Sequence, residues 1–347
     1  MSFDRLQEKI DKMRNPTVVG LDPALGHIPP QILEKHVAAM GETLDAAAAS
    51  VFEYNTGLID TLCDIVPAVK PQSAYYEALG PEGVRVLKAT CDYAKSRGLY
   101  VILDGKRNDI GSTAEAYSAA YLGTVKVGNA DLRPFDADAL TINAYLGTDG
   151  VIPFIENAVK YDKAVFALVK TSNPSSGELQ DRFICGGFEN LCVSNDDNTH
   201  NGDDRDFRNE SGDWKLTGND ACFRIEGRLY EIVGDLIEKI SHETIGKYGF
   251  TRVGAVAGAT YPEEIEFLRK RLKHTFFLVP GYGAQGGSAS DVACAFDADG
   301  HGAIVNSSRA IIAAWKKSGG DYAAAARAEA LRMRDELQEC IGYSPKP

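Results

Sequence analysis

Four ionisable residues follow a short apolar run in this chain of 347 residues. The segment 101–113 reads VILDGKRNDIGST, so Asp104, Lys106, Arg107 and Asp109 come directly after residues typical of a buried strand. Charges at such a place cost folding free energy unless they are paired or lie at a hydrated opening. Alternate residues of a strand point the same way, so we expect Asp104 and Lys106 to face one side together. An ammonium fixed beside carboxylates can stabilise developing negative charge and donate a proton.

The turn after this strand has an ordinary interpretation as well. An aspartate such as Asp109 commonly precedes a helix, and residues 112–115 (STAE) match the capping-box pattern, as do residues 260–263 (TYPE). The pattern Asp-x-Lys-x-x-Asp-Ile-x-x-Thr, which ends at Thr113, is more specific than a turn signal. We therefore treat the whole pattern as a candidate catalytic array.

The elements that must position this array form a regular series. Apolar, β-rich runs alternate with stretches of helical periodicity at 82–97, 223–247 and 262–273, which is typical of βα units. We expect eight strands, at residues 17–22, 67–72, 100–106, 139–143, 164–172, 252–259, 275–281 and 302–308. Eight units predict an α/β fold, a (β/α)8 TIM barrel, forming a single domain over residues 1–347. Such barrels carry their chemistry at the C-terminal ends of the strands.

Polar residues stand at or just beyond the ends of these expected strands. Any one of them is most simply a solvated loop residue, but their coincidence with the strand ends favours a common site. They are Asp22, Lys70, Asp104, Lys106, Asn143, Ser172, Gln285 and Arg309.

Residues 181–220 interrupt the series between the fifth and sixth strands. This segment contains ten acidic and four basic residues, is rich in Gly, Asn and Asp, and lacks clear periodicity. We interpret it as a long acidic loop insertion, partly ordered at best and peripheral to the site.

The composition limits the partners. A net charge of −12 argues against nucleic acid or an anionic membrane as the main partner, so an anionic ligand must be bound by a local Lys and Arg cluster. The start of the chain does not look like a signal peptide, and no apolar stretch approaches the ~18 residues of a membrane span. We expect a cytoplasmic protein. The seven cysteines and six histidines are scattered, which predicts no disulfide framework and no metal site. Since the chain also has no credible dinucleotide site, we expect no cofactor.

The array and its neighbours resemble the orotidine 5′-phosphate decarboxylase family, whose hallmark is Asp-x-Lys-x-x-Asp on the third strand of a (β/α)8 barrel. The resemblance covers nearly the whole chain. Its segments are VGLDP with Asp22, AVKPQSAYYE with Lys70, DGKRNDIGST with Asp104, Lys106, Asp109, Ile110 and Thr113, LVKTSNP with Ser172, PGYGAQGG with Gln285, and NSSRAI with Arg309. Two departures are the length of the insertion and Ser308, where many members have Gly.

The resemblance implies cofactor-independent decarboxylation of orotidine 5′-monophosphate to uridine 5′-monophosphate and CO2, in de novo pyrimidine synthesis. It also implies a homodimer in which Asp109 and Thr113 reach the neighbouring site. The implied catalytic residues are Lys70, Asp104, Lys106 and Asp109. The implied substrate-binding residues are Asp22, Ile110, Thr113, Ser172, Gln285, Ser308 and Arg309.

Three alternatives remain open from the residues. Gly281, Gly283 and Gly286 spell the GxGxxG of dinucleotide sites, but only one strand follows and no acidic residue ends it, so we interpret them as a flexible loop over a phosphate. Lys170 in FALVKTSNP resembles the Schiff-base lysine of deoxyribose-phosphate aldolases, which are also (β/α)8 barrels. A non-catalytic nucleotide-binding barrel is the third, although it has no use for Lys106 beside two carboxylates.

Overall fold

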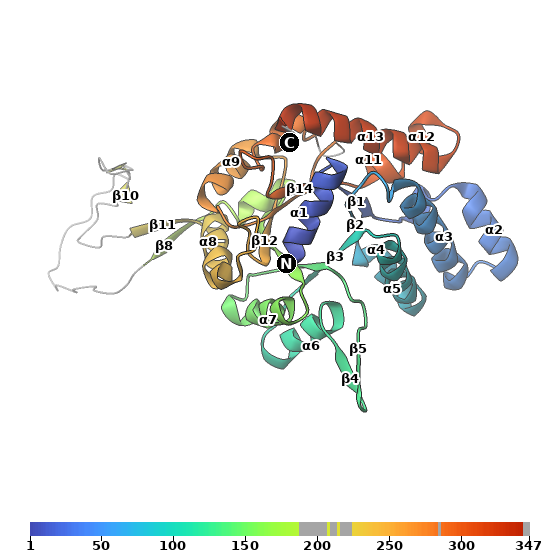
Figure 1. Ribbon diagram of the computed structural model, residues 1–347, viewed down its shortest axis with the longest axis horizontal. Helices are drawn as coiled ribbons and strands as arrows, with labels where there is room; N and C mark the ends of the chain where they lie inside the picture. Colours follow the sequence, from blue (N-terminus) through green and yellow to red (C-terminus); the bar gives the residue numbers. More distant parts are fainter. Residues whose placement is uncertain (187–206, 209–213, 216–223, 284–285, 343–347) are drawn as a thin grey trace, which may run out of the picture.

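Eight parallel strands close into a barrel at the centre of the computed structural model (Figure 1). The structure describes residues 1–186, 207–208, 214–215, 224–283 and 286–342. Around the barrel the strands follow the order β1 (Thr17–Leu21), β14 (Ala303–Ser307), β13 (Phe277–Val279), β12 (Val253–Ala257), β7 (Ala164–Lys170), β6 (Ala139–Ile142), β3 (Tyr100–Arg107) and β2 (Ala68–Pro71). The predicted (β/α)8 barrel is confirmed, and each predicted strand corresponds to one of these.

Burial on both faces explains why these segments read as continuous apolar runs. Every residue of β1, β2, β6, β12 and β14 is buried, because side chains that point inward fill the barrel and those that point outward meet the helices. Ile102, Phe166, Leu278 and Ile304 belong to the inner cluster. The alternation therefore fixes which strand-end residues can face the interior.

Helices cover the outside of the barrel and contribute the larger apolar cluster (Figure 1). The predicted helical stretches at 82–97 and 262–273 correspond to α5 and α9. The helices are α1 (Ser2–Met13), α2 (Pro30–Met40), α3 (Leu44–Leu62), α4 (Ser73–Glu77), α5 (Gly80–Ser96), α6 (Gly111–Tyr121), α7 (Ile152–Lys160), α8 (Leu229–Ser241), α9 (Pro262–Arg271), α10 (Ala289–Ala293), α11 (Arg309–Ile312), α12 (Trp315–Ser318) and α13 (Tyr322–Ile341). Among the described helices, none is long and apolar enough to cross a membrane.

Helix α1 covers the N-terminal end of the barrel (Figure 1). Its buried residues Phe3, Leu6 and Ile10 join the inner cluster, and the Phe3 ring lies 4.9 Å, between centroids, from the rings of both Phe166 and Phe276. This end is thereby filled with apolar side chains, which leaves the C-terminal ends of the strands as the place for an open site.

Within the described ranges, three short antiparallel pairs accompany the barrel. The hairpin of β4 (Val125–Val127) and β5 (Ala130–Leu132) projects from it beside α6 (Figure 1). The second pair is β8 (Phe183–Gly186) with β11 (Arg224–Arg228), and the third is β9 (Phe207–Arg208) with β10 (Trp214–Lys215).

The prediction of a helix from residue 223 is wrong at its start. Residues 224–228 form β11, and α8 begins at Leu229. The reason is non-local, since β11 finds its partner in β8 about forty residues earlier in the chain. The proposed limits of the insertion, 181–220, and the single-domain organisation stay predictions, because residues 187–206, 209–213 and 216–223 lie outside the described part of the chain.

Both predicted capping boxes are also wrong. Helix α6 starts at Gly111 with Ile110 as its N-cap, so Ser112 already lies within the first turn. Helix α9 has Tyr261 as its N-cap, and the hydroxyl of Thr260 donates instead to the carbonyl of Ser172 at 3.3 Å. A tertiary contact has taken the hydroxyl that the local pattern assigned to the helix.

Candidate active site

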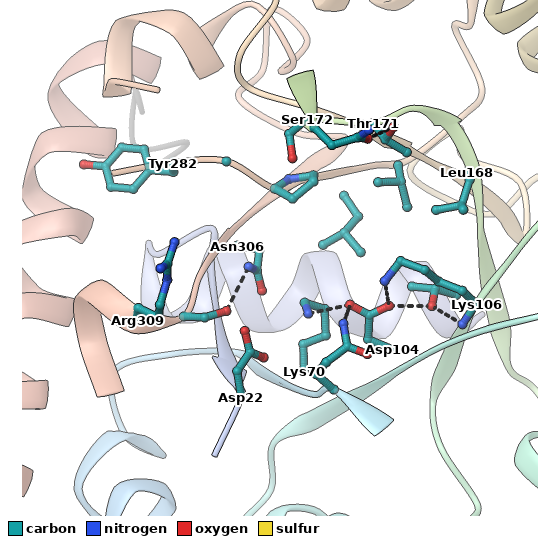
Figure 2. A pocket seen from close by; sticks show the side chains of 18 of the residues that line it. Asp22, Lys70, Asp104, Lys106, Leu168, Thr171, Ser172, Tyr282, Asn306 and Arg309 are labelled. Carbon is teal, nitrogen blue, oxygen red and sulfur yellow. Dashed lines mark hydrogen bonds and ion pairs between the residues drawn. The ribbon is translucent and has the colours of Figure 1, made fainter. Parts of the chain in front are cut away.

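A cavity of about 540 Å³ opens at the C-terminal ends of the barrel strands. Figure 2 shows Arg309 and Tyr282 at one side, Lys106 at the opposite side, and Asp22 and Asn306 between them. The lining residues are Asp22, Lys70, Gln72, Asp104, Lys106, Thr141, Leu168, Thr171, Ser172, Asn173, Gln180, Val256, Leu278, Pro280, Gly281, Tyr282, Asn306, Ser308 and Arg309. Seven of the predicted site residues therefore share one cavity: Asp22, Lys70, Asp104, Lys106, Ser172, Ser308 and Arg309.

Asp104 lies at the centre of the charged side of this cavity and accepts four hydrogen bonds. Its Oδ2 accepts from Lys70 Nζ at 2.7 Å and from Gln72 Nε2 at 2.9 Å. Its Oδ1 accepts from Lys106 Nζ at 2.7 Å and from Thr141 Oγ1 at 2.8 Å. The donors come from β2, β3 and β6 and from the residue after β2, so neighbouring strands together fix the orientation of this carboxylate.

The two lysines keep this buried carboxyl ionised. Burial disfavours the charged form of Asp104, but Lys70 and Lys106 outweigh it and hold the pKa of the carboxyl well below its ordinary value. Burial also acts to lower the pKa of Lys70, yet the negative charges of Asp104 and Asp22 outweigh it and raise that pKa above its ordinary value. At neutral pH the site therefore holds fixed, alternating charges.

The backbone at Lys106 is strained. This residue has φ of 47°, in the left-handed region, which costs a side chain other than glycine roughly 1 kcal/mol. Its N–H donates to Thr141 Oγ1 at 3.0 Å, which holds the unusual geometry. The Lys106 side chain remains 47% exposed while that of Lys70 is 6% exposed, so Lys106 is the ammonium available to a ligand.

Two acceptor atoms in the middle of the cavity have no hydrogen-bond partner within the described structure. They are Oδ1 of Asp22 and Oδ1 of Asn306, and both are buried. Because a buried acceptor without a donor costs about 1–3 kcal/mol, these atoms fit a ligand that brings hydroxyl groups. Ribose is such a ligand.

Ser308 is accommodated by a glycine on the neighbouring strand. A Cβ on Gly20 of β1 would lie 1.9 Å from Ser308 Oγ, so only glycine leaves room for this hydroxyl. Asn306 Nδ2 donates to the same Ser308 Oγ at 3.3 Å. The serine at position 308 is thus accommodated by the space at Gly20 and by the hydrogen bond from Asn306.

The opposite side of the cavity holds Arg309, the first residue of α11. Tyr282 lines the same side, and its hydroxyl donates to Glu336 Oε2 at 2.5 Å. Burial, together with this carboxylate, raises the pKa of Tyr282 far above its ordinary value. Because the Tyr282 hydroxyl is engaged by Glu336, Arg309 is the group on this side that suits an anionic ligand. The predicted residue Gln285 lies outside the described residues.

The remaining predicted residues do not line the cavity. Asp109 accepts a hydrogen bond from the N–H of Ile110 at 2.8 Å, and Ile110 and Thr113 lie exposed at the start of α6. Within one chain the structure therefore separates the second half of the array from Asp104 and Lys106.

Sequence reasoning missed Gln72, Thr141 and Asn306. Gln72 follows Lys70 at the i+2 spacing of a strand, and Thr141 lies two residues before Asn143, a predicted strand-end residue that does not line the cavity. The same alternation would have found both. The hydrogen bond that Thr141 donates to Asp104 depends on the pairing of β3 with β6, and the sequence does not show this pairing.

Lys170 does not line the cavity. Its side chain is 1% exposed and forms ion pairs with Asp181 and with Glu264, the latter at 3.3 Å. A Schiff-base lysine must reach the substrate as a neutral amine, so this position argues against the aldolase alternative. Among the described residues no group of three or more His, Cys, Asp or Glu side chains could hold a metal ion.

The chain is similar to known proteins in sequence and in fold. Residues 44–191 match the model of the Orotidine 5′-phosphate decarboxylase / HUMPS family. An orotidine 5′-phosphate decarboxylase of Rhodopirellula baltica is 38% identical, over 93% of this chain and 94% of its own. One from Caldicellulosiruptor bescii is 37% identical, over 90% of each chain. The solved OMP decarboxylase of Leishmania donovani is 28% identical with a TM-score of 0.65, covering 98% of this chain and 99% of that one. The chain therefore belongs to the orotidine 5′-phosphate decarboxylase family.

Proposed function

We propose that this protein decarboxylates orotidine 5′-monophosphate to uridine 5′-monophosphate and CO2, in de novo pyrimidine synthesis, without a cofactor. The observation that carries the proposal is Asp104 held between Lys70 and Lys106 in the cavity, at 2.7 Å from each ammonium. Loss of CO2 leaves an electron pair on C6 of the pyrimidine, and fixed charges are the means that this site has to stabilise it.

Lys106 is the residue that we assign to the reacting carbon. Its ammonium is the more exposed of the two and can stabilise the carbanion and then donate the proton that replaces CO2. Asp104 lies where the substrate carboxylate departs, and its four hydrogen bonds prevent it from turning away. Because the charges are already in place, little reorganisation accompanies the reaction.

The other substrate contacts follow from the positions of the lining residues between Arg309 at one side of the cavity and Lys106 at the other (Figure 2). We assign the phosphate to Arg309 and Ser308, the ribose hydroxyls to Asp22, and the pyrimidine edge to Ser172, with Gln285 bridging the base and the phosphate. Phosphate binding far from C6 lowers the barrier by orienting the ring above Lys106.

The test is the loss of the orotate chromophore's absorbance when the purified protein is mixed with orotidine 5′-monophosphate. We expect turnover in the wild type and in Lys12→Ala, an exposed lysine of α1, and none in Lys106→Ala. An unchanged absorbance with the wild type would refute the assignment. Borohydride trapping of a covalent adduct would favour an imine mechanism at a lysine instead.

We further propose that the active protein is a homodimer whose sites are shared. Large apolar residues are exposed around the segment that carries Asp109, including Ile110 at 55%, Val127 at 59% and Tyr145 at 68%. A second copy of the chain is the partner that would cover this face and bring its own Asp109, Ile110 and Thr113 to the cavity.

Complementation tests the shared site. Lys106→Ala and Asp109→Ala should each be nearly inactive, but a mixed dimer has one site with both native residues and one with neither. Random exchange makes half of the dimers mixed, so about a quarter of wild-type activity should return. If both variants dimerise and their mixture recovers nothing, Asp109 acts within its own chain.

We also propose a cytoplasmic location. Its support is that Cys63, Cys91, Cys294 and Cys340 are all free thiols, as is usual in a reducing compartment. Cell fractionation with an antibody against the protein would test it.

A further inference from the structure

The end of β7 is held from two sides by two consecutive residues of the returning chain. On the cavity side, Gln180 Oε1 accepts from the N–H of Thr171 at 2.9 Å, and Gln180 Nε2 donates to Thr171 Oγ1 at 2.8 Å. Away from the cavity, the next residue, Asp181, forms an ion pair with Lys170. Gln180 thus binds Thr171 on one face of the strand end, and Asp181 binds Lys170 on the other face.

The hydrogen bonds on the cavity side continue in one direction toward the loop. Thr171 Oγ1, having accepted from Gln180, donates to Asn173 Oδ1 at 2.6 Å. Asn173 Nδ2 in turn donates to Ser175 Oγ at 3.1 Å. The Gln180 amide therefore sets the hydroxyl orientation of Thr171 and, through it, the side chain of Asn173.

Ser172 lies in sequence between Thr171 and Asn173, the two residues that this hydrogen bond joins, and it points into the cavity (Figure 2). It packs closely against Gly258, the residue that follows β12, since a Cβ on Gly258 would lie 2.8 Å from the N, Cα and Cβ atoms of Ser172. The N–H of Gly258 donates to the carbonyl of Lys170 at 2.8 Å. The place of Ser172 is thus fixed by its two neighbours in sequence, and Gln180 holds one of them.

Lys170 supplies the anchor behind the strand. Its ammonium lies 4.7 Å from the centroid of the Tyr261 ring and 5.3 Å from that of Tyr230, and it pairs with Glu264 as well as with Asp181. A buried ammonium with two carboxylates and two aromatic faces is costly to disturb, because removal of one partner leaves another charge unpaired. The proposed decarboxylation makes no use of this cluster.

The segment before the insertion and the segment after it meet at this cluster. The N–H of Tyr230 donates to the carbonyl of Gln180 at 3.1 Å, and that of Leu229 donates to the carbonyl of Arg182 at 2.9 Å. Arg228 lies 3.7 Å from Glu264. Residues 180–182 and 228–230 therefore hydrogen-bond to each other beside β7. These bonds hold Gln180 in place without any contribution from the insertion between them.

We propose that Gln180 is a positioning residue that sets Ser172 and Asn173 against the pyrimidine, and that Lys170 and Asp181 hold Gln180 in place. This inference deepens the proposed function and rests on it, since the pyrimidine contacts of Ser172 belong to that proposal. In this proposal the buried Lys170 helps to hold the residues that form the base-binding end of the cavity. The hydrogen bonds that start at Gln180 lead to Thr171 and Asn173, and none of them leads to Arg309 at the phosphate-binding end.

The test compares two competitive inhibitors that share the ribose phosphate and differ in the base. Gln180→Met keeps the side-chain length and removes both bonds to Thr171. It should raise the inhibition constant of uridine 5′-monophosphate about tenfold and change that of ribose 5-phosphate less than about twofold. Gln31→Met, at an exposed position of α2, is the matched control and should change neither.

A double variant tests the route through Thr171. If Gln180 acts on the base through Thr171, the effect of Gln180→Met with Thr171→Val should be smaller than the product of the two single effects. Equal weakening of both inhibitors, or no weakening of uridine 5′-monophosphate, overturns the inference while the wild type still turns over substrate. A wild type that binds neither inhibitor refutes the proposed function and this inference with it.

Discussion

Both ends of the barrel hold an aspartate between two lysines. Asp104 does so at the C-terminal ends of the strands, and Asp136 at the N-terminal ends, where it pairs with Lys95 at 2.5 Å and with Lys163 at 2.7 Å. In each case burial acts against the charge, the cations outweigh it, and the pKa of the carboxyl lies well below its ordinary value. A carboxylate held between two lysines therefore does not by itself identify a catalytic centre, whether it is buried like Asp104 or partly exposed like Asp136.

The two clusters differ in what their cations face. At the N-terminal end Lys95 Nζ also donates to the carbonyl of Asp136 at 2.7 Å, and Arg133 adds a third cation at 2.7 Å. None of these residues lines the cavity. At the other end, Lys106 is half exposed into the cavity, and unpaired acceptors lie nearby. Incomplete pairing directed at an open cavity is what separates a reactive cluster from a structural one.

The largest expected difference between the clusters is in turnover. Lys106→Ala should lower kcat by about 10⁴-fold or more, because it removes both the proton donor and the charge beside the carbanion. Steady-state kinetics measures it, with Lys12→Ala as the control. A loss below about tenfold would mean that Lys106 is no more catalytic than Lys163, and the distinction between the two ends would fail.

The next effect sharpens the division within the cavity itself. Arg309→Ala should raise KM by about 100-fold, with a much smaller change in kcat, because it removes a charge-assisted bond to the phosphate. A drop in kcat as large as that of Lys106→Ala would show that Arg309 acts on the reacting carbon.

Asp136→Asn tests the N-terminal cluster. It should destabilise the fold by about 2 kcal/mol, because it leaves Lys95 and the buried Lys163 without their carboxylate, while kcat stays within about twofold. Denaturant unfolding and kinetics below the transition measure the two. A large loss of kcat in a fully folded variant would contradict a purely structural role.

The pH dependence of stability gives the same cluster a second signature. Because the pKa of Asp136 is lowered by folding, its stabilisation is fully present above the unfolded pKa near 3.8 and is lost as pH falls through the lower folded pKa. Asp136→Asn should therefore lose stability at neutral pH and show a flatter decline in acid. An unchanged acid profile would mean that other carboxyls dominate.

The smallest effect is expected in the insertion. Replacing residues 183–219 with a short Gly/Ser linker should leave kcat/KM within about threefold, because Asp181 and the bonds of residues 180 and 182 to 229–230 remain. An extended replacement of 181–228 removes Asp181 and Arg228 and should cost more. If the shorter replacement folds but abolishes turnover, the insertion belongs to the active site.

Much of this site was predictable because its parts are local. The spacing of Asp104 and Lys106 places both on one face of a strand, and Lys70 lies near the end of the preceding strand, β2. The roles assigned to Asp109, Ile110 and Thr113 stay predictions, since one chain does not bring them to the cavity. The predicted capping boxes failed where a local pattern competed with a tertiary contact, as at Thr260.

The sequence by itself determined the eight-strand series, the (β/α)8 class and the charged strand end, because strand periodicity and burial act over a few residues. Only the tertiary structure decided that Thr141 completes the shell of Asp104, that Gly20 makes room for Ser308, and that Lys170 turns away from the cavity. Those contacts join residues on different strands or helices, and their partners are set by the closure of the barrel. No spacing along the chain encodes them, because a side chain's neighbours across a sheet depend on register, which is fixed only when all eight strands pair.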